Sequence, residues 1–358
     1  MSVTALAEKL PAAARRGEYR GAETAAAYSD PRREFAALLS GCAIYDLGWR
    51  AKISLAGKDR IRWLNGMITN NIRDLASGHG LYAFLLNPQG RILGDMYAYN
   101  RGETLLLDTD QSQAAKLAEL LKRYIIMDKV ELANVSEQLT AIGITGPQSP
   151  ELLRHAGFEL PELAPLQLAD TVWQGIALTL VRGVPTGPAA PQAESYEIWL
   201  APENANSVWQ ALIAARATPV GSEALELYRI AAGIPRYSQD IRDRDLPQET
   251  EQIRALHFTK GCYIGQEIVE RIRSRGNVHR KFTGFVIEGP LPSAGTKLQL
   301  DGKDIAEVTS VASLPTASGE RVVALGYIRR EAAIPGKVLQ AGEGRAMVAE
   351  LPFQNIFG

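Results

Sequence analysis

The segment from Lys260 to Glu267 brings together the residues of this chain that are best suited to chemistry. It reads Lys-Gly-Cys-Tyr-Ile-Gly-Gln-Glu, and an amphipathic helical pattern follows Gly265. Cys262 therefore lies just ahead of a predicted helix N-terminus, where the helix dipole lowers the pKa of a thiol. Lys260 and His257 are close enough in sequence to lower this pKa further. A lone cysteine is more often a small buried apolar residue, so both interpretations stay open.

A basic stretch surrounds this thiol in the sequence. Residues 254–281 carry seven cationic side chains against two acidic ones. Such a stretch can bind the carboxylate tail of a ligand, a phosphate or an acidic partner, although most runs of charge are solvated surface. Arg271 is the residue of this stretch that we expect to contact a ligand.

Asp95 is the second candidate for chemistry. Two extended runs, residues 81–86 and 91–99, are joined by Asn-Pro-Gln-Gly, and Pro second with Gly fourth is typical of a type I turn. In this hairpin Asp95 shares a largely apolar face with Tyr97 and Tyr99. A carboxylate in that position needs a partner, either in an ion pair or at a sheet edge, or it faces a ligand such as a heterocycle.

Bulk composition limits the function classes. The 358 residues are 46% hydrophobic and 22% charged, with a formal net charge of -1, as in ordinary globular proteins of two or three domains. This charge does not favour binding to nucleic acid or to an anionic membrane. No apolar run approaches the roughly 20 residues that span a bilayer. We therefore expect a cytoplasmic monomer without a membrane segment.

The cysteine and histidine residues argue against a resident metal. Two cysteines, Cys42 and Cys262, and four scattered histidines have no zinc or iron–sulfur ligand spacing, and a disulfide framework needs more cysteines. We predict reduced thiols and no metal site.

The pattern of the chain predicts a mixture of helices and strands. A strand, a glycine and a helix follow one another twice, at residues 52–65 and 141–154, which suggests a weak internal repeat. Helical periodicity ends near Phe282, and short alternating runs follow, as in a small β-barrel. The remaining predicted elements are helices over 32–40, 204–216 and 222–232, a strand over 196–200 and a loop over 184–195.

A glycine motif at residues 78–83 matches the dinucleotide-binding fingerprint in residue types and spacing. The glycines here enter a predicted strand, whereas in that fold they leave a strand and open a helix. We therefore discard nicotinamide binding.

The Lys260 to Glu267 segment resembles the signature of the YgfZ proteins and their mitochondrial iron–sulfur assembly relatives. Other segments are similar, in order and spacing, to the folate-binding fold of the glycine-cleavage T-proteins. These segments are residues 46–49, 55–57, 64–71, 85–91, 196–198 and 228–235. Glycine-cleavage T-proteins lack the cysteine signature, so Cys262 favours the YgfZ branch.

The resemblance implies an α+β, T-protein-like, three-lobed folate-binding fold with a small antiparallel β-barrel at the C-terminus. It divides the chain into residues 1–140, the first half of the folate-binding domain; 141–280, the second half with the cysteine signature; and 281–358, the barrel. It also implies tetrahydrofolate as the ligand in a central cavity. The expected folate-binding residues are Asp95, Tyr82, Asn87, Glu197 and Arg271, with Cys262 and Lys260 as the chemically active pair.

One position departs from the T-protein pattern. The T-proteins carry a pteridine-binding Glu where this chain has Ala231. The loss of one charge-assisted hydrogen-bonded pair costs about 1.5–3 kcal/mol, or about tenfold to a hundredfold in affinity. Either folate binds weakly, another group such as Glu226 replaces the missing carboxylate, or the ligand differs.

Three functions follow from the resemblance. The first is an accessory role in assembly or repair of iron–sulfur clusters of the 4Fe-4S type, with assembly or client proteins as partners and Cys262 as the acting thiol. The second is a tetrahydrofolate-dependent aminomethyltransferase with a lipoyl-protein substrate. The third is a folate-dependent regulator of tRNA modification.

Overall fold

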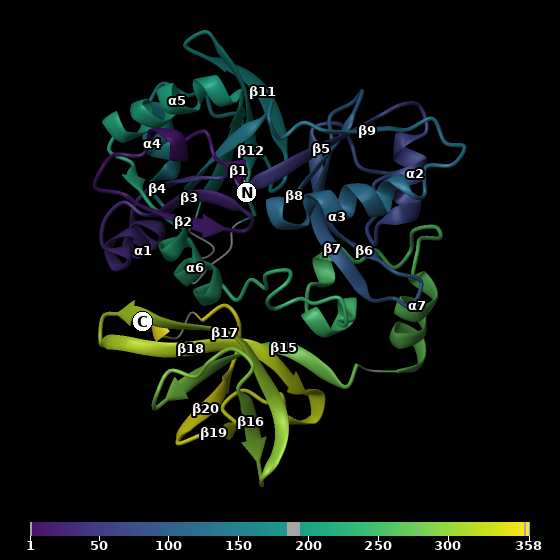
Figure 1. Ribbon diagram of the computed structural model, residues 1–358, viewed down its shortest axis with the longest axis vertical. Helices are drawn as coiled ribbons and strands as arrows, with labels where there is room; N and C mark the ends of the chain where they lie inside the picture. The colour runs from purple at the N-terminus through teal and green to yellow at the C-terminus, as the bar shows by residue number, and fades with distance from the viewer. Residues whose placement is uncertain (1, 185–193, 277, 354–355, 358) are drawn as a thin grey trace.

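The computed structural model describes residues 2–184, 194–276, 278–353 and 356–357. Figure 1 shows three parts, namely two helix-covered sheets side by side and a barrel beneath them. The barrel is closed by six strands at the C-terminal end of the chain. The predicted α+β class and the C-terminal barrel are therefore confirmed.

The first sheet has six strands in the order β11-β12-β13-β10-β4-β14. Its inner core packs against α4 and α5, through residues such as Ile198 and Trp209. The opposite face carries Glu197 and Trp199, because side chains alternate along β13. The bounds are β4 (Ala43–Asp46), β10 (Thr140–Thr145), α4 (Ser149–His155), β11 (Leu168–Trp173), β12 (Ile176–Arg182), β13 (Ser195–Leu200), α5 (Pro202–Ala214) and β14 (Thr218–Pro219).

The second sheet has five strands in the order β6-β7-β8-β5-β9. One face is an apolar core with residues such as Met96 and Leu107, which packs on Trp63 of α2 and Leu117 of α3. The other face is polar and aromatic. The bounds are β5 (Arg50–Ala56), α2 (Arg60–Met67), β6 (His79–Leu86), β7 (Ile92–Asn100), β8 (Leu105–Asp110), α3 (Gln111–Lys122) and β9 (Glu131–Asn134).

A small sheet at the N-terminal end of the chain packs against α6 (Ser222–Ala231). Strand β3 (Ala22–Ala27) lies between β1 (Ser2–Val3) and β2 (Arg15–Tyr19). Helix α1 (Pro31–Ser40) follows and also packs against α6. The carboxylate of Asp30 caps α1 by accepting from the Arg32 amide at 2.9 Å, as its position before Pro31 suggests.

The barrel has the strand order β15-β18-β17-β16-β19-β20 around an apolar core that includes Phe285 and Leu298. It begins at Arg280, two residues before the predicted start. The bounds are β15 (Arg280–Glu288), β16 (Lys297–Leu300), β17 (Lys303–Thr316), β18 (Gly319–Arg329), β19 (Val338–Ala341) and β20 (Gly344–Ala349). The domain boundaries at residues 140 and 280 stay a prediction.

The remaining elements are short apart from α7 (Gln266–Arg275), which follows Gly265 as predicted. The described part of the chain also has short 3-10 helices, namely η1 (Ala7–Lys9), η2 (Pro247–Thr250), η3 (Ile253–Ala255) and η4 (Arg330–Ala332). The predicted loop over 184–195 falls mainly on residues 185–193, outside the described residues. Among the described residues, no helix has both the length and the apolar character needed to cross a membrane.

Candidate functional site

The polar face of the second sheet gathers acidic, basic and aromatic side chains across three strands. Strand pairing places Tyr97 of β7 opposite Asp108 of β8, and Asp108 opposite Lys52 of β5. Because alternate residues share a face, Asp95 and Asp110 lie beside them on the same face. This set of residues, which includes Arg50 at the start of β5, is the polar face.

Asp95 is held by two side chains. The Tyr82 hydroxyl donates to Oδ2 at 2.6 Å, and Gln113 Nε2 donates to Oδ1 at 2.6 Å. The Asp95 amide in turn donates to Gln113 Oε1 at 3.2 Å. Burial, and then the charge of Asp110, raise the pKa of Asp95 above its ordinary value, against the two hydrogen bonds. A carboxyl of this kind can hold or release a proton beside a bound heterocycle.

Asp110 has a different environment from Asp95. Arg50 Nη1 lies 2.7 Å from its Oδ1, and Arg20 Nη1 lies 3.2 Å from its Oδ2. Burial alone would raise the pKa of Asp110, but the charges of Arg20 and Arg50 outweigh burial and lower it. The two carboxyl groups therefore differ in basicity, which is an arrangement found in acid–base sites.

Glu197 joins the polar face from the first sheet. Its Oε2 accepts from Trp199 Nε1 at 2.7 Å, and the Trp199 ring meets Tyr99 of the second sheet at 4.9 Å between centroids. Lys52 Nζ lies 4.8 Å from the centroid of the same indole ring. Burial, and then the charge of Asp108, raise the pKa of Glu197. Glu197 thus lies where the two sheets meet.

Aromatic rings line the polar face. Tyr82 and Tyr97 have centroids 5.1 Å apart, and Tyr97 and Tyr99 stack at 6.5 Å. The guanidinium of Arg254 lies 4.7 Å from the centroid of Tyr82. Planar rings beside two carboxyl groups suit a flat heterocycle that carries N–H donors.

Asn87 belongs to the hairpin turn. Its Oδ1 accepts from the Arg91 amide at 2.9 Å, which closes the turn. A Cβ at Gly265 would lie 2.6 Å from the Asn87 carbonyl oxygen, so only glycine lets the two loops approach. Asn87 therefore supports the cysteine loop, and its contact with folate stays a prediction.

The cysteine loop, residues 260–265, is anchored at both ends. Lys260 Nζ donates to the carbonyl oxygens of Asn65, Ile68 and Asn70 at 2.6–2.7 Å. The Ile264 amide donates to the Gly66 carbonyl oxygen at 3.2 Å, and these contacts fix the loop to α2. Between the anchors, the Cys262 thiol is exposed.

Lys260 is committed to this anchoring role. Only 8% of it is exposed, and it neutralises the carbonyl end of α2. Burial, and then the charge of Arg73, lower the pKa of Lys260 to about 7, whereas the three carbonyl oxygens favour the charged form. Its action on the Cys262 thiol stays a prediction.

Arg271 and Ala231 lie apart from the polar face. Arg271 is exposed on α7, and a role in holding the folate tail stays a prediction. Ala231 is fully buried in the apolar core between α1, α6 and the barrel, where Phe353 also packs. On the same helix Glu226 pairs with Arg229, which outweighs burial and lowers the pKa of Glu226 to about 2.

Several functional residues escaped the sequence analysis. Gln113, Arg50, Asp108 and Asp110 all contact the predicted carboxylate or its neighbours, but nothing in the local pattern marks them. One signal for Asp108 and Asp110 was available in the sequence, namely three leucines followed by Asp-Thr-Asp at residues 105–110. Acidic side chains at the end of an apolar strand need partners, so they indicate a polar site.

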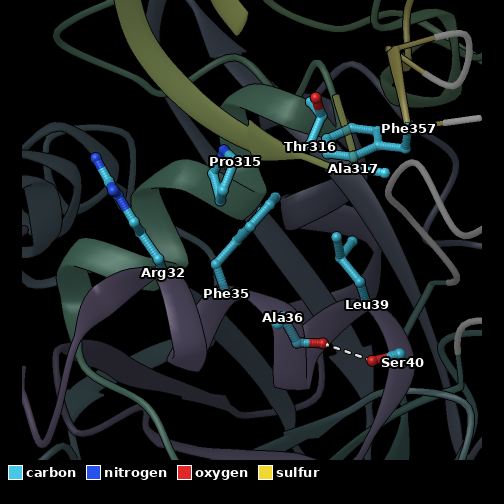
Figure 2. Close-up of a pocket in the computed structure, with 9 residues that line it drawn as sticks. All are labelled: Arg32, Phe35, Ala36, Leu39, Ser40, Pro315, Thr316, Ala317 and Phe357. Atoms are coloured by element: carbon cyan, nitrogen blue, oxygen red, sulfur yellow. Dashed lines mark hydrogen bonds between the residues drawn. The ribbon is translucent and has the colours of Figure 1, made fainter. Parts of the chain in front are cut away.

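A cavity of about 430 Å³ lies elsewhere, between α1 and the tip of the β17–β18 hairpin (Figure 2). Figure 2 shows Phe35, Leu39 and Phe357 around it, with Arg32 at one side. None of the residues that line it belongs to the polar face or the cysteine loop. Among the described residues, no group of three or more His, Cys, Asp or Glu side chains is placed to hold a metal ion.

The chain is similar to proteins of a known family. The family model for the GCVT N-terminal domain matches residues 8–260. An aminomethyltransferase of Rippkaea orientalis is 28% identical over 355 residues, which is 94% of this chain and 92% of the relative. A putative chloroplastic transferase of Arabidopsis thaliana is 26% identical over 88% of this chain and 72% of the relative.

A solved structure gives the same fold. The glycine cleavage system aminomethyltransferase T from Bartonella henselae superposes with a TM-score of 0.86, at 22% identity, over 100% of this chain and 99% of that one. The T-protein fold predicted from sequence is thus confirmed. The family match extends over most of the chain, and the chain belongs to the GCVT N-terminal domain family.

Proposed function

We propose that this chain is a folate-binding accessory protein of the YgfZ branch, which assists iron–sulfur cluster assembly or repair through Cys262. The observation that carries the proposal is the contrast between its two thiols. Cys262 is exposed on an anchored loop, whereas Cys42 is 4% exposed and lies in the apolar core of the first sheet. A thiol held at the surface by a fixed loop is placed to meet a group that another protein carries.

The cluster is substrate in this proposal. A cubane cluster uses four protein ligands, usually thiolates, and one exposed cysteine supplies at most one of them. The remaining ligands come from the partner, either an assembly protein or a client. This division of ligands favours a transient contact over a resident cluster.

Tetrahydrofolate is the proposed ligand of the polar face. Asp95 and Glu197 offer acceptors for the N–H groups of a pteridine, and Tyr97 offers a flat ring. Arg20 Nε is buried and has no hydrogen-bond partner among the described residues, so a donor is left for a carbonyl oxygen of the ligand. The chemistry of this donor and acceptor set fits a reduced folate. When bound, this ligand would supply a carrier of one-carbon groups or a redox-active ring.

The thiol role is tested in cells that lack this protein. Cys262→Ala should fail to restore the activity of an enzyme that depends on a 4Fe-4S cluster. Thr259→Ala, an exposed change in the same segment, should restore it. Full rescue by Cys262→Ala, at equal protein level, would rule out the thiol mechanism.

A second candidate function is transfer of an aminomethyl group to tetrahydrofolate. Asp95 favours it, because a carboxyl with a raised pKa is suited to proton transfer beside a folate nitrogen. Several relatives are also named aminomethyltransferases. Purified protein would be given tetrahydrofolate and an aminomethyl-loaded lipoyl carrier protein. Folate binding without formation of methylene-tetrahydrofolate would dismiss this function.

A further inference from the structure

An exposed apolar tip lies in the loop between α3 and β9. Ile126 and Met127 are 84% and 92% exposed, and Tyr124 is 40% exposed. Single apolar side chains are ordinary on a protein surface, whereas apolar side chains exposed next to one another are a feature of many contact sites. The tip is the group formed by Tyr124, Ile126 and Met127.

The loop that carries the tip is held in place on α2. Trp63 Nε1 donates to the Tyr124 carbonyl oxygen at 3.1 Å, and the Lys129 amide donates to Asp59 Oδ2 at 2.9 Å. Gly57 has a φ of +96°, and a Cβ there would lie 2.2 Å from the Lys129 carbonyl oxygen. A fixed loop loses little conformational entropy when it docks, which favours binding.

The surroundings of the tip are basic. Arg62, 66% exposed, pairs with Asp128 beside the tip. Residues 58–62 and 119–129 carry six cationic side chains against three acidic ones. The cationic residues are Lys58, Arg60, Arg62, Lys122, Arg123 and Lys129, and the acidic residues are Asp59, Glu119 and Asp128. An apolar tip with this rim complements an apolar depression bordered by acids.

The tip and the cysteine loop flank the same short helix. The loop with the tip contacts Trp63 of α2 and Asp59, the residue just before this helix, and the cysteine loop contacts the helix at Gly66. Eight helical residues span about 12 Å, whereas a standard interface covers about 800 Å² on each partner. Apart from its chain neighbours and the backbone of α2, no atom of the described residues lies within 4 Å of a Cβ placed on Gly66, so none of their side chains blocks that position.

Figure 1 places α2 and α7 together on the side of the molecule opposite α1. One partner can therefore reach both the tip and the thiol. The α2 surface is the area formed by Arg62, Gly66 and the tip, and Cys262 lies next to it on the cysteine loop.

We propose that the α2 surface docks an acidic partner protein, which receives Ile126 and Met127 in an apolar depression. The identity of this partner as the cluster-carrying protein rests on the proposed function, and docking would then bring its cluster to Cys262. A protein is favoured over a lipid surface. Burying two apolar side chains in a membrane contributes less binding free energy than inserting a single acyl chain, and one acyl chain alone binds a protein to membranes only marginally.

The first step of the test is site-specific crosslinking in cells. The photoreactive residue p-benzoylphenylalanine is placed at position 127, and at position 291 as the control, since Leu291 is also exposed (59%) but lies in the barrel. A protein adduct specific to position 127 is identified by mass spectrometry and purified. The absence of such an adduct overturns the proposal.

The second step measures the affinity of the purified pair. The double variant Ile126→Ser/Met127→Ser should raise the Kd about tenfold or more, whereas Leu291→Ser should leave it unchanged. Higher salt should weaken binding. An unchanged Kd in the double variant overturns the proposal, and so does binding of the wild type to phosphatidylglycerol vesicles that the double variant loses.

Failure of docking and failure of the proposed function are separable. Cys262→Ala should keep the affinity for the partner and lose the restored enzyme activity. If Cys262→Ala restores activity in cells, the thiol mechanism fails while the affinity measurement stands. Thermal unfolding should be unchanged in the double variant, because both replaced side chains are exposed.

Discussion

The Tyr82 hydroxyl donates a hydrogen bond of 2.6 Å to Asp95, while the Tyr82 ring lies in the same apolar cluster as Tyr263, the neighbour of Cys262. Tyr82 therefore bonds Asp95 of the polar face and shares an apolar cluster with the residue next to Cys262. Asn70 strengthens this link, because its Nδ2 donates to the carbonyl oxygens of both Tyr82 and Arg254 at 2.9 Å. The polar face and the cysteine loop are thus adjacent parts of one packed region.

Removing the charge of Asp95 should weaken folate binding. An Asn at position 95 can still bond Tyr82 and Gln113, so the fold is kept. Loss of a charge-assisted hydrogen bond to the ligand costs about 1.5–3 kcal/mol, or about tenfold to a hundredfold in Kd. Calorimetric titration of tetrahydrofolate into Asp95→Asn measures this change, with Asp301→Asn in an exposed turn as the control. Equal affinities would place the ligand elsewhere.

Glu197 should make stability depend on pH. Its raised pKa means that the folded state keeps a proton that the unfolded state releases. The stability that it contributes is complete below the unfolded pKa, about 4.3, and is lost as the pH rises through the folded pKa. Glu197→Gln lacks this loss, and its Gln can still accept from Trp199.

The difference in Tm between Glu197→Gln and the wild type should therefore increase between about pH 4 and pH 7. Glu103→Gln, at an exposed turn, is the control and should show a constant difference. A difference that shrinks as the pH rises would mean that Lys52 and Arg50 hold Glu197 ionised.

The two thiols should differ in reactivity. Burial raises the pKa of Cys42 to about 11 and shields its sulfur from reagents, whereas the Cys262 side chain is exposed at the surface. Ellman's reagent should modify one thiol in the folded wild type and a second one only after unfolding. In Cys262→Ser no thiol should react before unfolding. A fast reaction in that variant would contradict the burial of Cys42.

Replacing Lys260 distinguishes a role in anchoring the cysteine loop from a role in chemistry at Cys262. The change to Met leaves three buried carbonyl oxygens without their donor, which should cost about 3 kcal/mol of the free energy of unfolding. Urea denaturation measures this cost, and Lys303→Met on the exposed side of the barrel is the control. Unchanged stability together with lost activity in cells would instead assign Lys260 a chemical role.

Local patterns predicted the elements whose signals are local. The hairpin turn over residues 87–90 follows from proline and glycine placement. The helix predicted over 32–40 begins one residue earlier, at Pro31, after the capping carboxylate of Asp30. Strand β3 (Ala22–Ala27) was missed, because alanine is a poor strand former and this strand is sheltered between two others.

The candidate site depended on contacts that sequence proximity does not reveal. Lys260 lies two positions from Cys262, which suggested an electrostatic pair, but its ammonium bonds carbonyl oxygens at residues 65–70. Gln113 holds Asp95 only because α3 packs beside β7. Such contacts are set by tertiary packing, and one sequence contains no periodic signal for them.

Asp240 should be essential for attaching the barrel. It is fully buried and accepts from Arg229 Nη1 at 2.6 Å and from Ser310 Oγ at 2.7 Å, so it joins α6 to β17. Asp240→Asn leaves the buried Arg229 guanidinium with less negative charge, which should cost about 3–5 kcal/mol. Urea denaturation measures the loss, with the exposed Asp304→Asn as the control. A loss below about 1 kcal/mol would mean that Glu226 alone compensates Arg229, because a broken buried pair costs more than that.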